Sequence, residues 1–503
     1  MPKKAPITQI ETFGFERIPD ASRYARPRDV FRLLFGGCNT FSTSVLGAFP
    51  VLLGLSFQAG LWAIVAGVFA GTFILAPMSL FGPCNGTSDP VSSGAHFGIH
   101  GRIVGSFLAL LTSIAFFSLA VWSSGDALVG GAHTLTGLPV NNWTLGSAYL
   151  IFAVLVLVVC VYGFRFMLWV NKIAVWTASL LFLLGAFAFY DVLDTHYAGV
   201  LQLGTPGFWG AFIASVLVAM SNPVSFASTL GDWTRYVPEN TPRRRLMASV
   251  YAAQIATFVP FFFGLATATI ISTTAPSFIQ ADDYVGGLLA VSPTWFLLPV
   301  CLIAIIGGMS TGTTALYGTG LDMSSIFPKV FDRVRATVFI GVLAIGFIFL
   351  GRFAFNLVQS VSTFSTLICT FSCPWIAIMV IGYLQRRGFY LADDLQVFNR
   401  GGRGGHYWFT HGWNLRAICA WLPAAFIGLS MVNLPGQFVG PLGSLFGDLD
   451  LSVPVSFVTG GVLYLLALWV CPEPAAVYGP RGGRFIRAPG ERTRGHVHKA
   501  VAP

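Results

Sequence analysis

The chain has 503 residues, of which 55% are hydrophobic and only 10% are charged. A soluble domain has about one-quarter charged residues, so this composition excludes a soluble globular protein. The net charge of +9 would suit a nucleic-acid-binding protein, but Lys and Arg occupy alternate segments between apolar stretches and form no single basic stripe. We therefore expect no nucleic-acid partner.

Apolar runs of about 20 residues recur along the chain, and a helix of this length crosses a hydrocarbon core about 30 Å thick. We predict an all-α polytopic membrane protein with about twelve transmembrane helices in a lipid bilayer. The predicted spans are residues 30–55, 59–82, 103–125, 145–164, 168–190, 208–231, 247–272, 294–321, 336–357, 360–384, 415–434 and 453–471.

The distribution of Lys and Arg predicts the orientation. If the N-terminus is cytoplasmic, every Lys and Arg except Arg352 falls on or near the cytoplasmic side, as the positive-inside rule requires. We expect a multi-pass protein of the cytoplasmic membrane with both termini inside. The basic termini are interpreted as topogenic, with binding of anionic lipid as the alternative. The outside would then hold 126–144, 191–207, 273–293 and 435–452, and the cytoplasm the polar inserts 83–102, 232–246 and 385–414.

Two predicted spans contain helix-breaking residues. Residues 36–44 of the first span read GGCNTFSTS, and residues 221–228 of the sixth read SNPVSFAS. Pro lacks a backbone donor and Gly lowers helix propensity, so backbone groups freed here must face protein, an ion or a wet cavity. A matched pair of broken helices five spans apart predicts a midplane substrate site in an inverted-repeat transporter. A pair of kinks that allow tight helix packing is the alternative.

The eighth span carries four hydroxyls within the five residues from Ser310 to Thr314. A lone hydroxyl in a membrane helix usually bonds back to its own backbone, but a cluster can offer several neutral oxygens. With carbonyls of Gly37 and Thr40 from the broken first span, these oxygens would suit a small monovalent cation better than Ca²⁺. Helix packing through these small residues is an equal alternative.

Acidic residues inside the spans are scarce. Asp126 and Asp232 end the third and sixth spans, where we expect solvation at the membrane interfaces. Because no buried carboxylate relay is evident, sodium coupling is favoured over proton coupling. The eight cysteines form no CxxC or His-spaced set, and no nucleotide-binding or hydrolase motif is present, so we expect neither a resident cofactor nor an enzyme.

Several short motifs resemble one transporter family. Residues 231–238 read GDWTRYVP, similar to an aspartate-aromatic-x-arginine-tyrosine-x-proline signature, and FGIHG at 97–101, ALYGTG at 315–320 and Pro374 followed by GYL at 382–384 add support. Together they resemble the nucleobase:cation symporter-1 family, especially its purine/cytosine permease branch. The likeness extends from about residue 10 to residue 390.

The resemblance implies a fold and a cation site. The fold is a LeuT-like 5+5 inverted repeat plus two extra C-terminal helices, with alternating access around the first, third, sixth and eighth spans. The units are a cytoplasmic arm at 1–29, repeats at 30–190 and 208–384, a cytoplasmic loop at 385–414, the extra helices at 415–471 and a basic cytoplasmic tail at 472–503. The implied sodium site takes carbonyls of Gly37, Thr40 and Gly307 and hydroxyls of Ser310 and Thr311.

The resemblance is weaker at the substrate positions. The family's glutamine and tryptophan of the third span fall on Ser113 and Phe116, and its asparagine of the eighth span falls on Gly312. Phe116 can still stack on a flat ring, but Ser113 and Gly312 lack the amide that reads a pyrimidine edge. The full set of candidate substrate-binding residues is Phe41, Ser113, Phe116, Asn222, Pro223, Ser225, Phe226 and Gly312.

The leading hypothesis is a secondary transporter that imports a small molecule, a nucleobase or related planar heterocycle, with Na⁺ as the coupling cation. Purines, cytosine, allantoin and hydantoins belong to this substrate class. The same fold transporting an amino acid or a vitamin, or coupling to protons, is the first alternative. A ligand-binding membrane sensor or a channel is the second.

Overall fold

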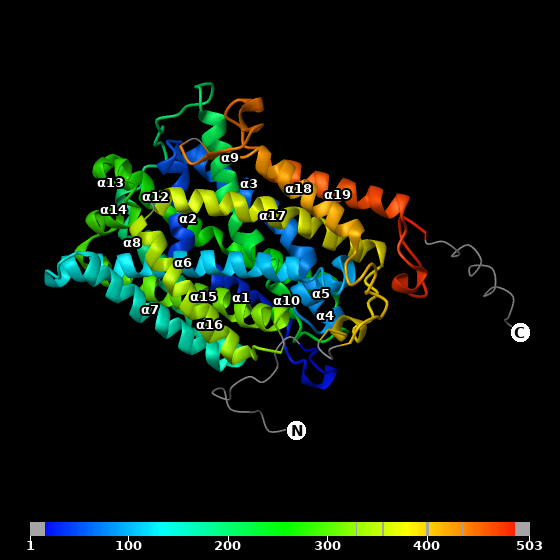
Figure 1. Cartoon of the computed structure of the whole chain (residues 1–503). Helices are drawn as coiled ribbons and strands as arrows, with labels where there is room; N and C mark the ends of the chain where they lie inside the picture. Colours follow the sequence, from blue (N-terminus) through cyan, green and yellow to red (C-terminus); the bar gives the residue numbers. More distant parts are fainter. Residues whose placement is uncertain (1–15, 328, 355–356, 399–401, 435, 488–503) are drawn as a thin grey trace, which may run out of the picture.

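The computed structural model describes residues 16–327, 329–354, 357–398, 402–434 and 436–487. Within them the chain forms a bundle of helices elongated along one axis (Figure 1), with one small hairpin of β1 (Asn433–Leu434) and β2 (Phe438–Val439). The predicted N-terminal arm and basic tail lie partly outside the described residues.

Ten spans are long and apolar enough to cross a membrane, and the described residues contain two shorter apolar helices, α2 and α18. With the broken first span and α18 counted, the structure has the twelve spans that the sequence predicts. In chain order they are α1 (Pro27–Cys38) with α2 (Phe41–Leu52), α3 (Phe57–Leu75) with α4 (Phe81–Asn85), α6 (Ile103–Thr136), α7 (Asn142–Tyr162), α8 (Phe164–Ala188), α9 (Phe208–Ser225) with α10 (Leu230–Thr234), α11 (Arg243–Ala256) with α12 (Phe258–Thr274), α15 (Thr294–Ile326), α16 (Arg333–Ala354), α17 (Leu357–Gln385), α18 (Leu415–Ser430) and α19 (Ser452–Val470).

Three segments that we predicted as loops are helical. The third span runs past its predicted end at residue 125 as far as Thr136, where Gly137 (φ 74°) takes the left-handed conformation that ends a helix. Its 34 residues make a helix about 51 Å long, which exceeds a hydrocarbon core about 30 Å thick. The insert 83–102 contains α5 (Asp89–Phe97), and the segment 273–293 contains α13 (Pro276–Gln280) and α14 (Tyr284–Val291).

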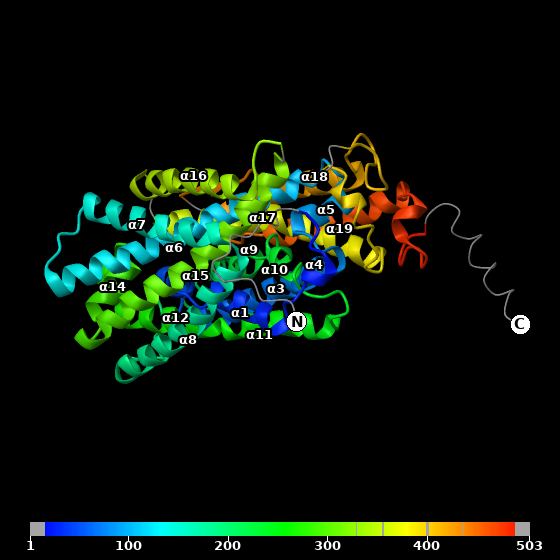
Figure 2. The same ribbon diagram turned by 90° about the horizontal axis from the view of Figure 1, so that it is seen from below.

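The broken helices lie at the centre of the bundle. There α15 packs along α6 and α8, α2 packs on α9 and α12, and α3 packs on α9, while α18 and α19 pack together outside α17 (Figures 1 and 2). The outer helices expose large apolar side chains, among them Phe73 on α3, Trp176 on α8 and Trp469 on α19. A water-exposed surface of this kind would be costly, whereas a hydrocarbon surrounding matches it.

The two ends of the bundle differ in charge. Figure 1 shows α13 and α14 at one end and α4, α5 and α10 at the other. The second end also carries the C-terminal residues up to 487 (Figure 1) and the end of α17 with Arg386 and Arg387, and Arg243 at the start of α11 lines one cavity with Arg387. We call this end of the bundle the basic end.

Candidate substrate and cation sites

Both interrupted spans break near the middle of the bundle, and a hydrogen bond joins them. In the first span α1 ends at Cys38 and α2 begins at Phe41, with the Thr40 hydroxyl oxygen accepting from the backbone N–H of Thr43 at 3.3 Å as an N-cap. In the sixth span residues 226–229 separate α9 from α10. The amide Nδ2 of Asn222 donates to the Thr43 hydroxyl oxygen at 3.3 Å, so the two breaks face each other.

A cavity of about 20 Å³ lies between the two breaks. It is lined by Gly37, Thr40, Ser42, Thr43, Leu46, Thr112, Ser113, Phe116, Leu119, Asn222, Ser225, Phe226, Thr229, Thr311, Thr314 and Ala315. This volume holds about one or two water molecules, whereas pockets for organic ligands measure roughly 300–1,000 Å³. The surrounding helices must therefore separate before a heterocycle can enter.

Five of the eight candidate substrate-binding residues come together at this cavity. They are Ser113, Phe116, Asn222, Ser225 and Phe226. They come from α6, α9 and the turn after α9, so the packing of the third and sixth spans brings them together. Their part in substrate binding stays a prediction.

The other three candidates do not line the cavity. A Cβ at Gly312 would lie 3.0 Å from the side chain of Val156, so this position faces α7. The ring of Pro223 packs against Gly71 of α3, where a Cβ would lie 2.4 Å from the ring. Phe41 stacks on Tyr284 of α14, with 6.4 Å between the ring centroids.

Several hydroxyls line the cavity that the sequence argument did not choose as site residues, among them Thr112, Thr229 and, in the eighth-span cluster, Thr314. Helical spacing contains a signal for two of them. Thr112 lies one turn before Phe116 and Thr314 lies three residues after Thr311, so each shares a helix face with a residue already chosen. Thr229 belongs to the unwound segment, where no helical period applies.

Asn222 gives the cavity an unsatisfied polar group. The residue is 3% exposed, and its Oδ1 has no hydrogen-bond partner among the described residues. Whichever way the amide is turned, one of its polar atoms is left to bind a ligand. The rings of Phe116 and Phe226 line the same cavity. Aromatic faces beside a few polar groups form a site suited to a flat ring with hydrogen-bonding edges.

The predicted cation-site residues also come together, where α1 and α2 meet α15. The Thr311 hydroxyl donates to the Gly37 carbonyl at 2.9 Å. A Cβ at Gly307 would lie 2.9 Å from Cα of Thr40, so the close approach of α15 to the break requires a glycine. The Ser310 hydroxyl lies 2.6 Å from the Gly36 carbonyl. Because α1 ends at Cys38, these last carbonyls have no helical N–H partner.

Asn171 of α8 adds an oxygen that the sequence argument missed. Its Oδ1 lies 2.5 Å from the Ser310 hydroxyl, which therefore has two acceptor oxygens within 2.6 Å but only one proton to donate. The signal available in the sequence was an Asn inside an apolar span, and the structure shows that this residue is fully buried. Neutral oxygens this crowded at the negative end of the α1 dipole suit a small monovalent cation. Among the described residues no cluster of three His, Cys, Asp or Glu side chains points to a different metal.

Besides Glu473, which pairs with Arg386, three buried carboxylates of the described residues lie at the basic end. We expected Asp232 to be solvated, and this was wrong, because α5 covers this end and leaves Asp232 fully buried. Asp89 of α5 accepts from the Gly231 N–H at 2.6 Å, and Asp322 of α15 lies within electrostatic range of Asp89, Asp232 and Arg102. Burial raises the pKa of Asp89 well above its usual range, and the nearby Asp232 raises it further. The hydrogen bond from the Gly231 N–H lowers this pKa but does not offset the effect of burial.

Twelve helical spans around two broken helices and a central cavity are the architecture of an inverted-repeat membrane transporter. A family profile described as permease for cytosine/purines, uracil, thiamine, allantoin matches residues 17–453. The chain belongs to this family, which confirms the family predicted from the motifs.

Known relatives and a solved structure agree with this assignment. The putative purine-cytosine permease YxlA of Bacillus subtilis is 24% identical over 470 residues, covering 92% of this chain and 96% of the relative. The vitamin B6 transporter TPN1 of Saccharomyces cerevisiae is 24% identical over 369 residues, covering 68% of this chain and 61% of the relative. The structure of Mhp1, a nucleobase-cation-symport-1 family transporter with bromovinylhydantoin bound, superposes with a TM-score of 0.69 at 18% identity and covers 90% of this chain and 94% of that one. This likeness confirms the LeuT-like fold.

Proposed function

We propose that this permease imports a nucleobase or a related planar nitrogen heterocycle, of the purine, cytosine, allantoin or hydantoin class, by symport with Na⁺. The observation that carries the substrate class is the unpartnered amide oxygen of Asn222 in a cavity shared with the rings of Phe116 and Phe226. A flat ring can stack on an aromatic face while an N–H at its edge bonds the amide oxygen.

The other polar groups of the cavity favour recognition of a class of heterocycles over recognition of a single base. Ser113 and Ser225 present hydroxyls, and a hydroxyl can both donate and accept a hydrogen bond. A second amide in their place would instead fix one pattern of donors and acceptors. The Ser225 hydroxyl donates to the backbone carbonyl of Asn222 at 2.6 Å, which holds it beside the Asn222 side-chain amide that would bind substrate. Heterocycles with different edges can therefore satisfy the same walls.

Shared residues support coupling between substrate and cation. Gly37, Thr40 and Thr311 belong to the proposed cation site and also line the substrate cavity. A cation that draws the Gly37 carbonyl and the Thr311 hydroxyl toward itself would fix one wall of that cavity. Each ligand would then strengthen the binding of the other by the same factor.

A proton is the second candidate for the coupling ion, because Asp89, Asp232 and Asp322 are all buried at the basic end. Arg102 is a buried cation within electrostatic range of Asp322. A proton bound by one of the three carboxylates would lower the cost of burying their like charges side by side.

Uptake into proteoliposomes tests the proposal. The purified chain should accumulate labelled hypoxanthine, cytosine, allantoin or hydantoin when an inward Na⁺ gradient is imposed, and should not do so with K⁺ in its place. Accumulation driven equally by an inward proton gradient without Na⁺ would select the proton. Binding of these heterocycles without accumulation under either gradient would refute transport and favour a sensor.

A vitamin is the second candidate substrate, and the similarity to a vitamin B6 transporter supports it. A thermal-shift screen that includes pyridoxine, thiamine and amino acids beside the nucleobases separates the classes. Stabilisation by pyridoxine and by none of the nucleobases would overturn the proposed substrate class.

We also propose that the protein lies in the cytoplasmic membrane with the basic end toward the cytoplasm, as its arginine-rich termini favour. Labelling of single-cysteine variants with a membrane-impermeant maleimide tests this orientation. Reaction of a cysteine at position 481 in intact cells would contradict it.

A further inference from the structure

A second cavity, of about 330 Å³, opens at the basic end and is lined by four arginines. They are Arg243 at the start of α11, Arg387 just after α17, and Arg481 and Arg484 in the C-terminal segment, and Tyr383 and Leu384 complete the lining. None of these arginines forms an ion pair with a described acidic residue. The cavity therefore concentrates positive charge with no carboxylate in its wall.

Tyr383 shows that the cavity has an unused hydrogen-bonding group. The residue is 5% exposed, and its hydroxyl lies beside the Cys84 thiol, a weak hydrogen-bonding group, with no nitrogen or oxygen partner among the described residues. A buried hydroxyl without a partner is costly, and most such groups are satisfied by protein, water or a ligand. An anionic oxygen in the cavity would accept this proton.

The start of α11 also lacks a compensating negative group. Its N-cap, Pro242, makes no side-chain capping bond, and its first turn holds no acidic residue but three consecutive arginines from Arg243 to Arg245. Positive side chains at the positive end of a helix dipole are unfavourable. The Arg245 and Leu246 N–H groups donate to the Pro242 carbonyl, whereas those of Arg243 and Arg244 have no helical acceptor and can bind an anion. A bound anion would relieve both defects.

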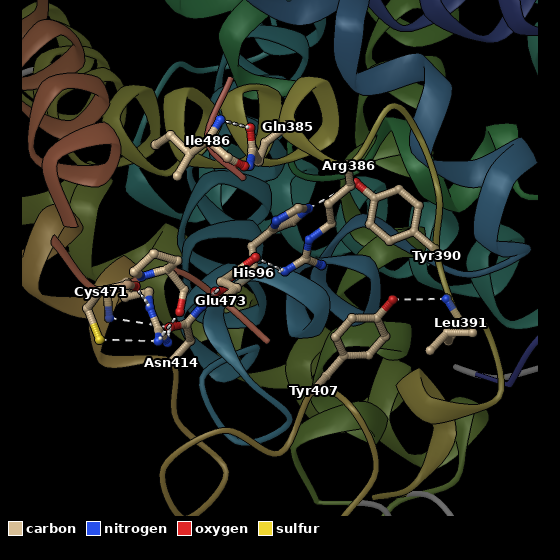
Figure 3. A network of polar contacts seen from close by, with 12 residues as sticks. His96, Gln385, Arg386, Tyr390, Leu391, Tyr407, Asn414, Cys471, Glu473 and Ile486 are labelled. Atoms are coloured by element: carbon tan, nitrogen blue, oxygen red, sulfur yellow. Dashed lines mark hydrogen bonds and ion pairs between the residues drawn. The ribbon is translucent and has the colours of Figure 1, made fainter. Parts of the chain in front are cut away.

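The C-terminal segment is fixed in place, so the two arginines that it contributes are positioned in advance. Figure 3 shows the buried ion pair of Arg386 with Glu473, at 2.9 Å, and the contact of Gln385 with Ile486. The Gln385 side-chain oxygen accepts from the Ile486 N–H at 3.2 Å, and the Gln385 carbonyl accepts from the Arg484 N–H at 2.9 Å. These contacts join the segment to the end of α17.

Arg387 adds a sign of local strain. Its φ of 55° lies in the left-handed region, which is uncommon for a residue other than Gly, Asn or Asp. Strained residues of this kind concentrate at ligand sites, where the surrounding contacts hold them. Here the turn is made by Arg387 and Gly388, both with positive φ, and the side chain of Arg387 lines the cavity.

We infer that this cavity binds a phosphate group, and that its source is the headgroup of an anionic phospholipid. Arginine is well suited to phosphate, because its planar donors bind two phosphate oxygens at once. The cavity lies where α11 begins and α17 ends, and both helices belong to spans long and apolar enough to cross a membrane. The ends of such spans lie near the lipid headgroups. Exposed Leu384 and Phe485 beside it offer contact for an acyl chain.

Lipid titration of the full-length protein tests the inference. The ligands are dioctanoyl phosphatidic acid, dioctanoyl phosphatidylglycerol, zwitterionic dioctanoyl phosphatidylcholine and inorganic phosphate, with binding followed by native mass spectrometry and thermal shift. Arg387→Ala and Arg484→Ala should each weaken the affinity for the anionic lipids about fivefold. The matched control is Arg244→Ala, which removes an exposed arginine of the same helix end that does not line the cavity and should change the affinity less than twofold.

Tyr383→Phe gives a second readout, because it removes the buried hydroxyl and keeps all four charges. It should weaken the binding of phosphatidic acid, phosphatidylglycerol and inorganic phosphate. Phosphatidylcholine, whose choline cation compensates its phosphate charge, should bind weakly to both proteins. If Arg244→Ala weakens the lipids as much as Arg387→Ala does, the binding is diffuse and the site is refuted. If inorganic phosphate binds as tightly as the lipids and responds to the same variants, the phosphate site stands and its assignment to lipid is overturned.

Discussion

Thr311→Ala is the sharpest test of the cation site. Thr311 is 5% exposed, and its hydroxyl donates to the Gly37 carbonyl at 2.9 Å. Without sodium the variant loses a neutral hydrogen bond, which costs about 1 kcal/mol of stability. With sodium it loses a contact between a polar group and a charge, about 1.5–3 kcal/mol. The difference, about 0.5–2 kcal/mol, corresponds to a roughly 2- to 30-fold weaker sodium affinity.

The assay is the midpoint of sodium-dependent thermal stabilisation of the purified protein, with choline replacing sodium. Thr311→Ser keeps the hydroxyl and should shift this midpoint less than about threefold. Thr319→Ala is the control, because this buried hydroxyl of the same helix donates back to the Leu316 carbonyl at 2.6 Å, away from the site. Equal midpoints for Thr311→Ala and Thr319→Ala would show that the hydroxyl cluster serves packing.

The remaining predictions concern helix packing, pH and the substrate. Gly264→Ala would place a Cβ 1.9 Å from the Ser44 carbonyl oxygen and force α12 away from α2, so we expect the free energy of unfolding to fall by about 2–3 kcal/mol. In the control, Gly346→Ala, the new Cβ points into open space, and the change should be neutral or slightly stabilising. Equal thermal midpoints for the two variants would contradict this. Burial holds the pKa of His96 well below its usual range, so the folded chain keeps the ring neutral while the unfolded chain gains a proton below about pH 6.5. The free energy of unfolding therefore falls as the pH drops from 6.5 toward the folded pKa, by up to about 1.4 kcal/mol per pH unit. His96→Gln should remove this pH-dependent loss. If thermal scans at pH 7.5 and 5.5 shift equally for both proteins, His96 is not its source. Asn222→Ala should weaken heterocycle binding by about 1–3 kcal/mol in a ligand titration and leave sodium binding without substrate intact, and an unchanged heterocycle affinity would remove Asn222 from the site.

The sequence predicted the spans and their breaks well because both are local properties. Apolar length fixes which segments cross the bilayer, and residues such as those at 36–40 break a helix wherever it lies. The direction of a side chain from the eighth span depends on how that helix is rotated against its neighbours. Thr311 and Gly312 are adjacent, yet a turn of about 100° per residue places Thr311 in the cavity and Gly312 against Val156.

The buried carboxylates show the other limit. Asp89, Asp232 and Asp322 come from segments far apart in the sequence, and no local pattern places them together. Asp232 ends an apolar run, which in isolation indicates an interface. The structure covers it with α5, a helix rich in Ser, Gly and Pro that reads as a polar loop.

The small volume of the substrate cavity has a thermodynamic consequence. The helices must separate before a ligand fits, so the apparent dissociation constant equals the intrinsic one divided by the fraction of molecules that are open. Replacements at the tight contact of Ser44 with Gly264, on the helices α2 and α12, would then change that fraction and the measured affinity without touching the ligand. Two permeases with identical cavity walls can thus differ in affinity through residues that only hold the bundle closed.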